Sequence, residues 1–182
     1  MKILEIKWMS LMIKLNLILS SFFILFLFIF NSTKADTFLS GFPVIIDADT
    51  IKISNYKIRL FGIDAPEKKQ FCEKPYFDLI IFSFKEKYPC GKVSTDALKK
   101  FIKDKIISCR IEEKKDFYKR YLATCFKNDK KINSWLVKNG YALAYKKYSK
   151  KYLLDEQYAK QNKLGLWRGT FMKPEKWRRI SK

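Results

Sequence analysis

Two short apolar runs, at residues 51–53 and 56–61, are separated only by Ser54 and Asn55. Apolar and polar positions alternate along both runs, and turn-forming residues lie between them, which predicts two β-strands joined by a tight turn. Because a hairpin brings its two ends together, we expect the acidic residues before the first strand and after the second to lie close in space. These residues are Asp47, Asp49, Asp64 and Glu67.

Further along the chain, the spacing of apolar residues alternates between the helix period and the strand period. Residues 93–103 place apolar side chains on one helical face, and residues 152–163 follow the same spacing less strictly. Apolar runs at 106–111 and 121–126 predict two more strands, joined by a charged loop.

Shorter segments complete the expected fold. A helix is predicted over 133–139, with Asn133 as its cap and Gly140 as its stop. The apolar stretch at 77–84 is expected to be a helical turn or a buried loop, and the tail, 166–182, is expected to dock through its aromatic residues. Five short strands and about three helices in this order predict an α+β, mainly β domain of the small-barrel type.

The first 35 residues differ from the rest. A mostly apolar run at 15–30 follows basic residues and precedes the small residues Thr33 and Ala35. This pattern is typical of a secretory signal peptide cleaved after Ala35. The alternative is an uncleaved membrane anchor, although this run is short for a bilayer span. We therefore expect a secreted or periplasmic protein whose domain is 36–182, with a basic and aromatic tail from about residue 167.

The chain is strongly basic, with 38 Lys and Arg against 18 Asp and Glu and a formal charge of +20. Residues 36–182 keep 34 of these basic residues against 17 acidic ones, so the charge belongs to the expected domain. An apolar content of 48% supports a packed core and argues against global disorder. The basic charge favours polyanionic partners, either nucleic acid or an anionic membrane surface.

All four cysteines lie in the expected domain, and an even number in an exported protein favours disulfides. Three pairings are possible. We favour Cys72–Cys90 and Cys109–Cys125, because each closes a loop of fewer than 20 residues. Antiparallel pairing of the two predicted strands can also bring the second pair together. A four-cysteine metal site is the alternative, and the absence of a Cys-x-x-Cys pair counts against it.

The acidic cluster at the hairpin ends has the chemistry of a hard-cation site. Close carboxylates repel one another, and Ca²⁺ accepts several oxygen ligands in irregular geometry. The chain has no histidine, which argues against zinc or another soft metal. Arg59 should face away from Ile58 and Leu60, and a guanidinium beside a cation suits a phosphate group. An ordinary hairpin with solvated charges is the alternative from spacing alone.

A second polar segment, 116–120, ends where a strand is predicted to begin. It contains Arg120, and an extended backbone would place Tyr118 on the same face. A second arginine suits phosphodiester hydrolysis, in which charge builds on the phosphoryl oxygens. Taken alone, the segment is more simply a solvated basic turn.

Together these segments resemble the thermonuclease, or staphylococcal nuclease-like, family over roughly residues 42–169. The matching pieces are Asp47-Ala48-Asp49-Thr50, 59–67, 116–120, 133–140 and 163–167. The resemblance implies an OB-fold barrel that binds nucleic acid on one face. It also implies Ca²⁺-dependent hydrolysis of DNA and RNA.

The resemblance implies roles for individual residues. Asp49 and Asp64 match the carboxylate ligands of calcium, and Ala65 matches a ligand that acts through its backbone carbonyl. Arg59 and Arg120 match the arginines that bind the phosphate and stabilise its charge.

Two further positions match, and one departs. Glu67 matches the carboxylate proposed to activate the attacking water, and Tyr118 matches a substrate-binding tyrosine. Ala48 replaces the glycine of the familiar Asp-Gly-Asp-Thr form, which is unfavourable if the turn needs a positive φ.

The sequence therefore predicts an exported, calcium-dependent endonuclease acting on DNA and RNA, with no obligate protein partner evident. A non-catalytic nucleic-acid-binding OB-fold protein is the main alternative, because charge and aromatic residues suffice for binding. Such a binder would not require the complete set Asp49, Arg59, Asp64, Glu67 and Arg120. A cationic envelope-associated protein is a third reading, which leaves these motifs unexplained.

Overall fold

The structure is a computed structural model that describes residues 2–29, 36–78 and 83–181. It divides into two units, Met1–Ala35 and Asp36–Lys182. The first unit holds helix α1 (Lys2–Ile29). Within the described residues, no helix combines the length and the apolar character required to cross a membrane. The signal peptide stays a prediction.

The main sheet of the second unit is built mostly from antiparallel pairs, with one parallel pair. Its strand order is β1-β8-β9-β4-β3-β2, and β10 pairs with β9. Neighbours are antiparallel except β4 and β9. The strands are β1 (Phe38–Gly41), β2 (Pro43–Ile45), β3 (Thr50–Ile53), β4 (Tyr56–Leu60), β8 (Ile107–Lys115), β9 (Tyr121–Lys127) and β10 (Lys130–Lys131). The predicted turn at Ser54 and Asn55 joins β3 to β4.

The mixed α+β class is confirmed, and in the described part of the chain the strands predicted to form a five-stranded OB-fold barrel do not close into one. Among the described residues the sheet is open, because its edge strands β1 and β2 are not paired with each other. These two edge strands are nevertheless consecutive in the chain, with only Phe42 between them. The chain itself, rather than a hydrogen-bonded ladder, connects the two edges.

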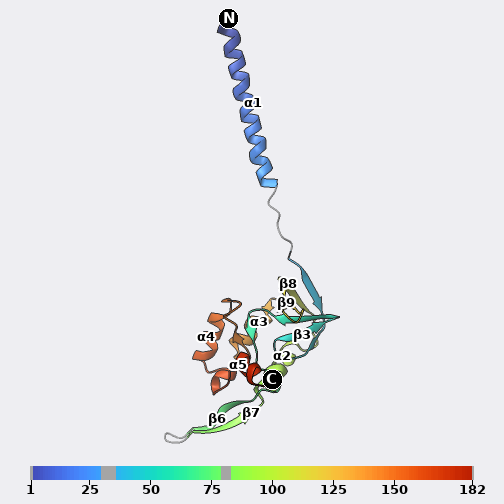
Figure 1. The fold of residues 1–182 in the computed structure, drawn as a ribbon, viewed down its shortest axis with the longest axis vertical. Coiled ribbons are helices and arrows are strands. Elements are labelled where there is room, and N and C mark those ends of the chain that lie inside the picture. The colour runs from blue at the N-terminus through green and yellow to red at the C-terminus, as the bar shows by residue number, and fades with distance from the viewer. Residues whose placement is uncertain (1, 30–35, 79–82, 182) are drawn as a thin grey trace. The chain divides into compact units, whose positions relative to one another are not determined.

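Helices lie between and after the strands along the second unit (Figure 1). They are α2 (Cys90–Ile102), α3 (Ile132–Lys138), α4 (Leu153–Gln161), the 3₁₀ helix η1 (Gly165–Arg168) and α5 (Pro174–Ile180). The three helices expected from periodicity correspond to α2, α3 and α4. The tail contains the additional helix α5, which the sequence pattern did not predict.

The segment expected to be a helical turn or buried loop is instead part of a hairpin. Strands β6 (Cys72–Asp78) and β7 (Ser83–Tyr88) pair as a separate two-stranded sheet, and residues 79–82 lie outside the described residues. The hairpin extends away from the other elements of its unit (Figure 1). A disulfide between Cys72 and Cys90 joins its base to the first residue of α2.

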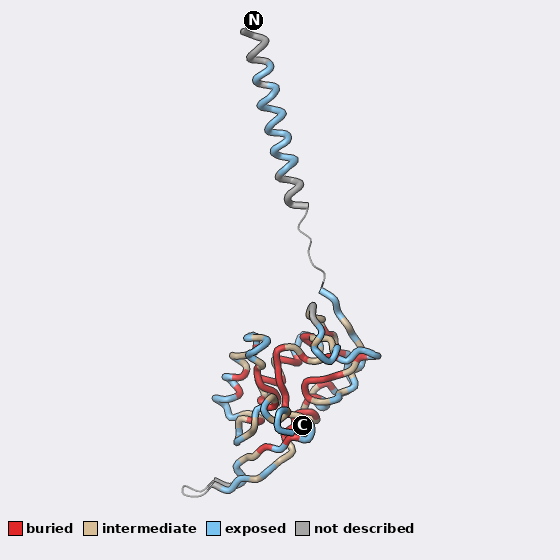
Figure 2. The backbone as a smooth tube through the Cα atoms, viewed as in Figure 1, coloured by how far each residue is buried: buried red, intermediate tan, exposed pale blue. Residues whose placement is uncertain are grey.

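The core lies between the main sheet and the helices, where the buried segments gather in Figure 2. Alternate residues of β3 and β4 point into it, as the strand pattern predicted. The second disulfide, Cys109–Cys125, joins paired positions of β8 and β9 inside this core. The largest fully buried apolar residues are Ile51, Ile53, Ile58, Leu60, Ile63, Leu98, Ile107, Ile132, Leu136 and Val137.

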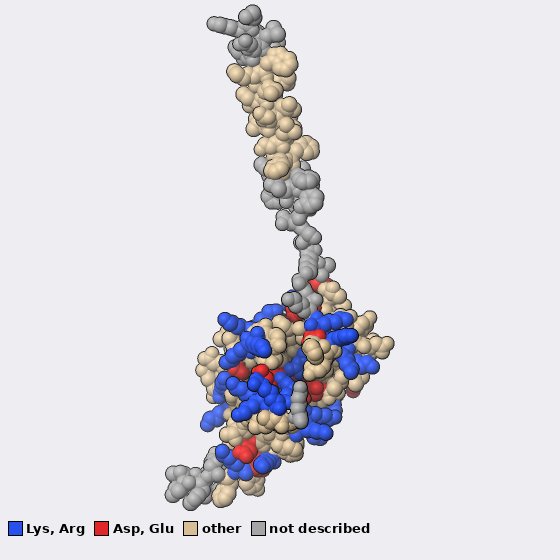
Figure 3. Space-filling model, in the orientation of Figure 1, with Lys and Arg blue, Asp and Glu red and all other residues tan. Residues whose placement is uncertain are grey.

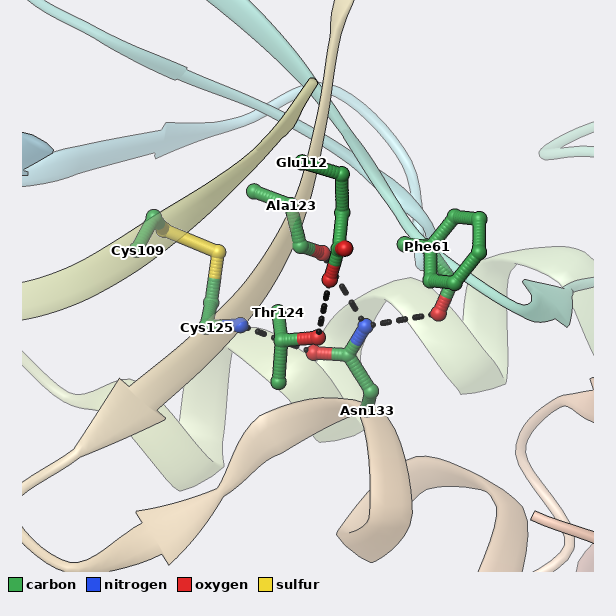
Figure 4. The surroundings of a disulfide bond; sticks show 7 residues. All are labelled: Phe61, Cys109, Glu112, Ala123, Thr124, Cys125 and Asn133. Carbon is green, nitrogen blue, oxygen red and sulfur yellow. Dashed lines mark hydrogen bonds between the residues drawn. A yellow bond between two sulfur atoms is a disulfide. The ribbon is translucent and has the colours of Figure 1, made fainter. Parts of the chain in front are cut away.

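Asn133 is not the cap of α3, contrary to the sequence prediction. The helix begins at Ile132, so Asn133 lies within its first turn. Its buried side chain accepts a hydrogen bond from the Cys125 amide at 3.0 Å and donates to the carbonyls of Phe61 at 2.9 Å and Ala123 at 3.2 Å (Figure 4). The side chain therefore fastens α3 to the strands instead of capping it.

Candidate active site

The first part of the site is the turn that leads into β3. The Asp49 amide donates to Asp47 Oδ1 at 3.0 Å, and the Leu60 amide donates to the Asp49 carbonyl at 2.8 Å. Ala48 is fully buried and has no positive φ, so alanine fits where the related motif has glycine. The hairpin also places Thr50 opposite Arg59, which sets the acids beside the arginine.

Asp49 is the most enclosed carboxylate of this group, with 2% of its surface exposed. One oxygen, Oδ2, accepts a hydrogen bond from the Ala65 amide at 2.8 Å. The other, Oδ1, accepts from the Thr50 hydroxyl at 3.1 Å and from Arg59 Nη1. Every one of these hydrogen bonds to the carboxylate therefore comes from a donor of the chain itself.

Arg59 connects two of the predicted metal ligands. Its Nη1 pairs with Asp49, and its Nη2 lies 2.8 Å from Asp64 Oδ1. Burial lowers the pKa of the Arg59 guanidinium, while the charge of Asp64 opposes that effect. Arginine remains cationic in proteins, so the group supplies a fixed positive charge between the acids.

Arg120, which directly precedes β9, is connected to Asp49 and Arg59 through Thr50. Its Nη1 donates to the Thr50 hydroxyl at 3.1 Å, and Thr50 in turn donates to Asp49. Asp116 orients Arg120 by accepting from its Nε and Nη2, each at 2.7 Å. The ring of Tyr118, which is exposed, lies 5.4 Å from the Arg120 guanidinium carbon. The segment 116–120 is therefore an ordered part of the site.

Glu67 sits at the rim of the site, with about a third of its side chain exposed. Its amide donates to Gln70 Oε1 at 3.3 Å, and its carbonyl accepts from the Gln70 amide at 2.7 Å. Gly91, in the first turn of α2, packs so closely that an added Cβ would lie 1.7 Å from the Glu67 carbonyl oxygen. These contacts fix the backbone that carries Glu67.

Sequence reasoning missed one residue of the site, Arg178 in helix α5. Its Nη1 lies 2.9 Å from Asp64 Oδ1 and 3.0 Å from Glu67 Oε1, and its Nη2 lies 3.2 Å from Asp64 Oδ2. Burial lowers its pKa, but the hydrogen bonds and charges of Asp64 and Glu67 outweigh that effect and raise the pKa above the usual arginine value. No local pattern marks this residue, because it is 114 positions from Asp64.

The donor chemistry of the site fits a hard divalent cation. Asp49, Asp64 and Glu67 offer carboxylate oxygens, which are the ligands that Ca²⁺ prefers. Within the part of the chain that the structure describes, no three acidic or cysteine side chains gather closely enough to form a metal site. The oxygens of Asp64 and Glu67 instead face the guanidinium of Arg178. The ligand roles of Asp49, Asp64 and the Ala65 carbonyl stay predictions.

A cleft of about 500 Å³ begins at Asp64 and runs beside β11 (Leu143–Ala144), which pairs with β5 (Ile63–Asp64). Aromatic and basic side chains contribute much of its wall: Tyr145, Trp167, Phe171, Lys146, Lys147 and Lys173. The buried indole Nε1 of Trp167 has no hydrogen-bond partner among the described residues. Acidic side chains, Asp64, Glu156 and Glu175, line the same cleft, so its wall combines aromatic, basic and acidic groups.

Basic side chains also spread widely over the face of this unit seen in Figure 3, with fewer acidic ones among them. This distribution agrees with the excess of Lys and Arg in residues 36–182. Such a surface attracts polyanions over distances longer than any single contact.

Arginines bridge acids at the end of this mixed sheet, and comparisons with known proteins show to which family the chain belongs. The family described as "Staphylococcal nuclease homologue" matches residues 57–169. "Succinoglycan biosynthesis protein ExoI" of Rhizobium meliloti is 35% identical over 131 residues, which cover 70% of this chain and 64% of that protein. An "Uncharacterized endonuclease" of Haemophilus influenzae is 33% identical over 147 residues, which cover 76% of this chain and 71% of that protein. "Probable staphylococcal-like nuclease CAN3" of Oryza sativa subsp. japonica is 32% identical over 155 residues, which cover 80% of this chain and 36% of that protein.

The chain belongs to the staphylococcal nuclease homologue family, as the sequence motifs predicted, because the match covers more than half of its length. The chain spans less than two thirds of the Rhizobium and rice proteins. The matched region includes Arg59, Asp64, Glu67 and Arg120, and it ends before Arg178.

Proposed function

We propose that this protein is an exported, calcium-dependent nuclease that hydrolyses phosphodiester bonds in DNA and RNA. The observation that carries the proposal is the linked group Asp49–Arg59–Asp64, with Arg120 joined to it through Thr50. Two arginines from separate segments next to buried acids match what attack on a phosphodiester requires. Family membership and relatives named as nucleases support the same reading.

Each residue has a task that follows from its chemistry. Arg59 and Arg120 would bind the phosphoryl oxygens and offset the charge that develops on them during attack. Glu67, at the exposed rim, would accept a proton from the attacking water. Asp49 and Asp64, with the Ala65 carbonyl, would hold the divalent cation, which when bound polarises a phosphate oxygen and positions water.

Substrate binding would depend on charge and stacking rather than on sequence readout. The basic surface would supply most of the affinity for the backbone, so binding should weaken steeply as salt rises. Tyr118 would contact the substrate beside Arg120. The aromatic wall of the cleft at Asp64 is suited to stack a base of the bound strand.

Export is proposed from two features. The N-terminal pattern of residues 1–35 fits a signal peptide, and the domain holds disulfides Cys72–Cys90 and Cys109–Cys125. Disulfides persist in oxidising compartments such as the periplasm and the extracellular space.

The test is incubation of residues 36–182 with supercoiled plasmid DNA and with single-stranded RNA, with added Ca²⁺ or with a chelator. We expect cleavage of both polymers with Ca²⁺ and none with chelator. Cleavage in both conditions would contradict the calcium requirement, and cleavage in neither would contradict the nuclease.

A further inference from the structure

The guanidinium of Arg178 occupies three of the four carboxylate oxygens of Asp64 and Glu67. Its Nη1 atom is shared between the two acids, at 2.9 Å and 3.0 Å. Asp64 Oδ1 additionally accepts from Arg59 at 2.8 Å. Each of these three oxygens thus accepts at least one hydrogen bond from a positively charged group of the chain itself.

The position of Arg178 is built by a series of contacts that dock the tail. The Gln70 side-chain amide, which is fully buried, donates to the Met172 carbonyl at 2.7 Å. Thr170 exchanges backbone hydrogen bonds with Glu73, at 2.9 and 3.0 Å. Gln70 also contacts the Glu67 backbone, so the same residue holds both the tail and the acid.

The neighbouring arginine of the same helix behaves differently. The Arg179 side chain is 73% exposed and pairs with Glu175 within α5, whereas the Arg178 side chain is 32% exposed and points to the site. The two residues carry the same charge on the same short helix. Comparing substitutions of the two arginines therefore separates the effect of the contact with Asp64 and Glu67 from the effect of the tail's charge.

We propose that Arg178 is a positioning residue of the site, which holds Asp64 and Glu67 together in the absence of the divalent cation and must leave the oxygens of Asp64 before that cation binds. The inference rests on the proposed function, because it assigns Asp64 to the cation and Glu67 to the attacking water. Its physical basis is competition: a guanidinium and a divalent cation are both positive and would need the same lone pairs.

Two consequences follow. Without the cation, Arg178 prevents repulsion between Asp64 and Glu67 and holds them near one another. When the cation binds, Arg178 is released. The free energy of the contact between Arg178 and the acids is then lost, and this loss weakens the apparent affinity for the cation. Arg178 therefore sets the Ca²⁺ concentration at which the site fills.

The experiment is calorimetric titration of Ca²⁺ into residues 36–182, as wild type, Arg178→Gln, Arg178→Lys and Arg179→Gln. Thermal unfolding in chelator first establishes that each variant is folded. We expect Arg178→Gln to bind Ca²⁺ about tenfold more tightly than wild type, and Arg179→Gln to stay within about twofold of it. Arg178→Lys keeps the charge but cannot bridge the acids with two nitrogens, so its Ca²⁺ affinity should lie between those of Arg178→Gln and Arg179→Gln.

Two results would overturn the inference, and they are distinguishable from failure of the proposed function. Equal or weaker Ca²⁺ binding by Arg178→Gln, relative to Arg179→Gln, overturns the competition while leaving the calcium site intact. No Ca²⁺ binding by any of the four proteins overturns the calcium site itself, and the role of Arg178 with it.

Discussion

Replacing Asn133 with alanine should destabilise the domain far more than its small change in side-chain size implies. Asn133 is fully buried and fastens α3 to β9 and to Phe61, which directly follows β4 (Figure 4). The Ala123 carbonyl keeps a second donor, the Phe61 amide at 2.8 Å. The Phe61 carbonyl and the Cys125 amide lose the hydrogen bonds that Asn133 supplies.

The magnitude follows from these two backbone groups. A buried polar group that loses its partner costs about 1–3 kcal/mol, so the substitution should lower the free energy of unfolding by about 2–6 kcal/mol. In a domain of this size, a loss in the middle of that range lowers Tm by about 10 °C.

The assay is thermal unfolding followed by circular dichroism, with Asn162→Ala as the matched control. Asn162 makes one exposed hydrogen bond, to the Tyr158 carbonyl at 2.9 Å, so its loss should change the free energy by less than about 0.5 kcal/mol. Equal Tm values for the two variants would refute the view that Asn133 satisfies buried backbone groups.

Three further predictions concern the site and its surroundings. Arg59→Lys should lower kcat/KM for DNA by about 100-fold, because an ammonium cannot bind two phosphoryl oxygens as the guanidinium fork would; a normal rate would remove Arg59 from phosphate binding. Gly91→Ala should lower Tm and turnover together, because the new Cβ meets the Glu67 carbonyl; an unchanged Tm would contradict the close approach. Burial raises the pKa of Tyr152, so its contribution to stability is complete below the unfolded pKa of about 10 and is lost as pH rises through the higher folded value. The Tm of Tyr152→Phe should therefore decrease less than that of wild type as pH rises above about 10. An equal decrease in the two proteins would contradict this prediction.

The features predicted correctly from sequence depend on contacts between residues that are close in the chain. The β3–β4 hairpin is encoded by alternation around Ser54 and Asn55, and its alternate residues Ile51, Ile53, Ile58 and Leu60 are buried. Each disulfide joins cysteines fewer than 20 positions apart. The group Asp49, Arg59 and Asp64 comes together because that hairpin brings its ends close.

The features that were missed depend on contacts between distant residues. The tail helix α5 has seven residues, too few for a periodic signal, and it is docked partly by the Gln70–Met172 contact across 102 positions. Hairpin β6–β7 has charged residues and Pro75 among its strand positions, which obscures the strand pattern. Asn133 has a side chain typical of a cap, and only the folded structure gives it buried partners.

The central claim is that acids and arginines from separate segments act together on one phosphodiester. The most direct test compares plasmid turnover and DNA binding for wild type, Glu67→Gln and Glu86→Gln, a control on the projecting hairpin where Glu86 pairs with Lys74. The account predicts that Glu67→Gln loses at least about 100-fold in turnover while it keeps DNA affinity, and that Glu86→Gln changes neither. Wild-type turnover by Glu67→Gln would contradict the account.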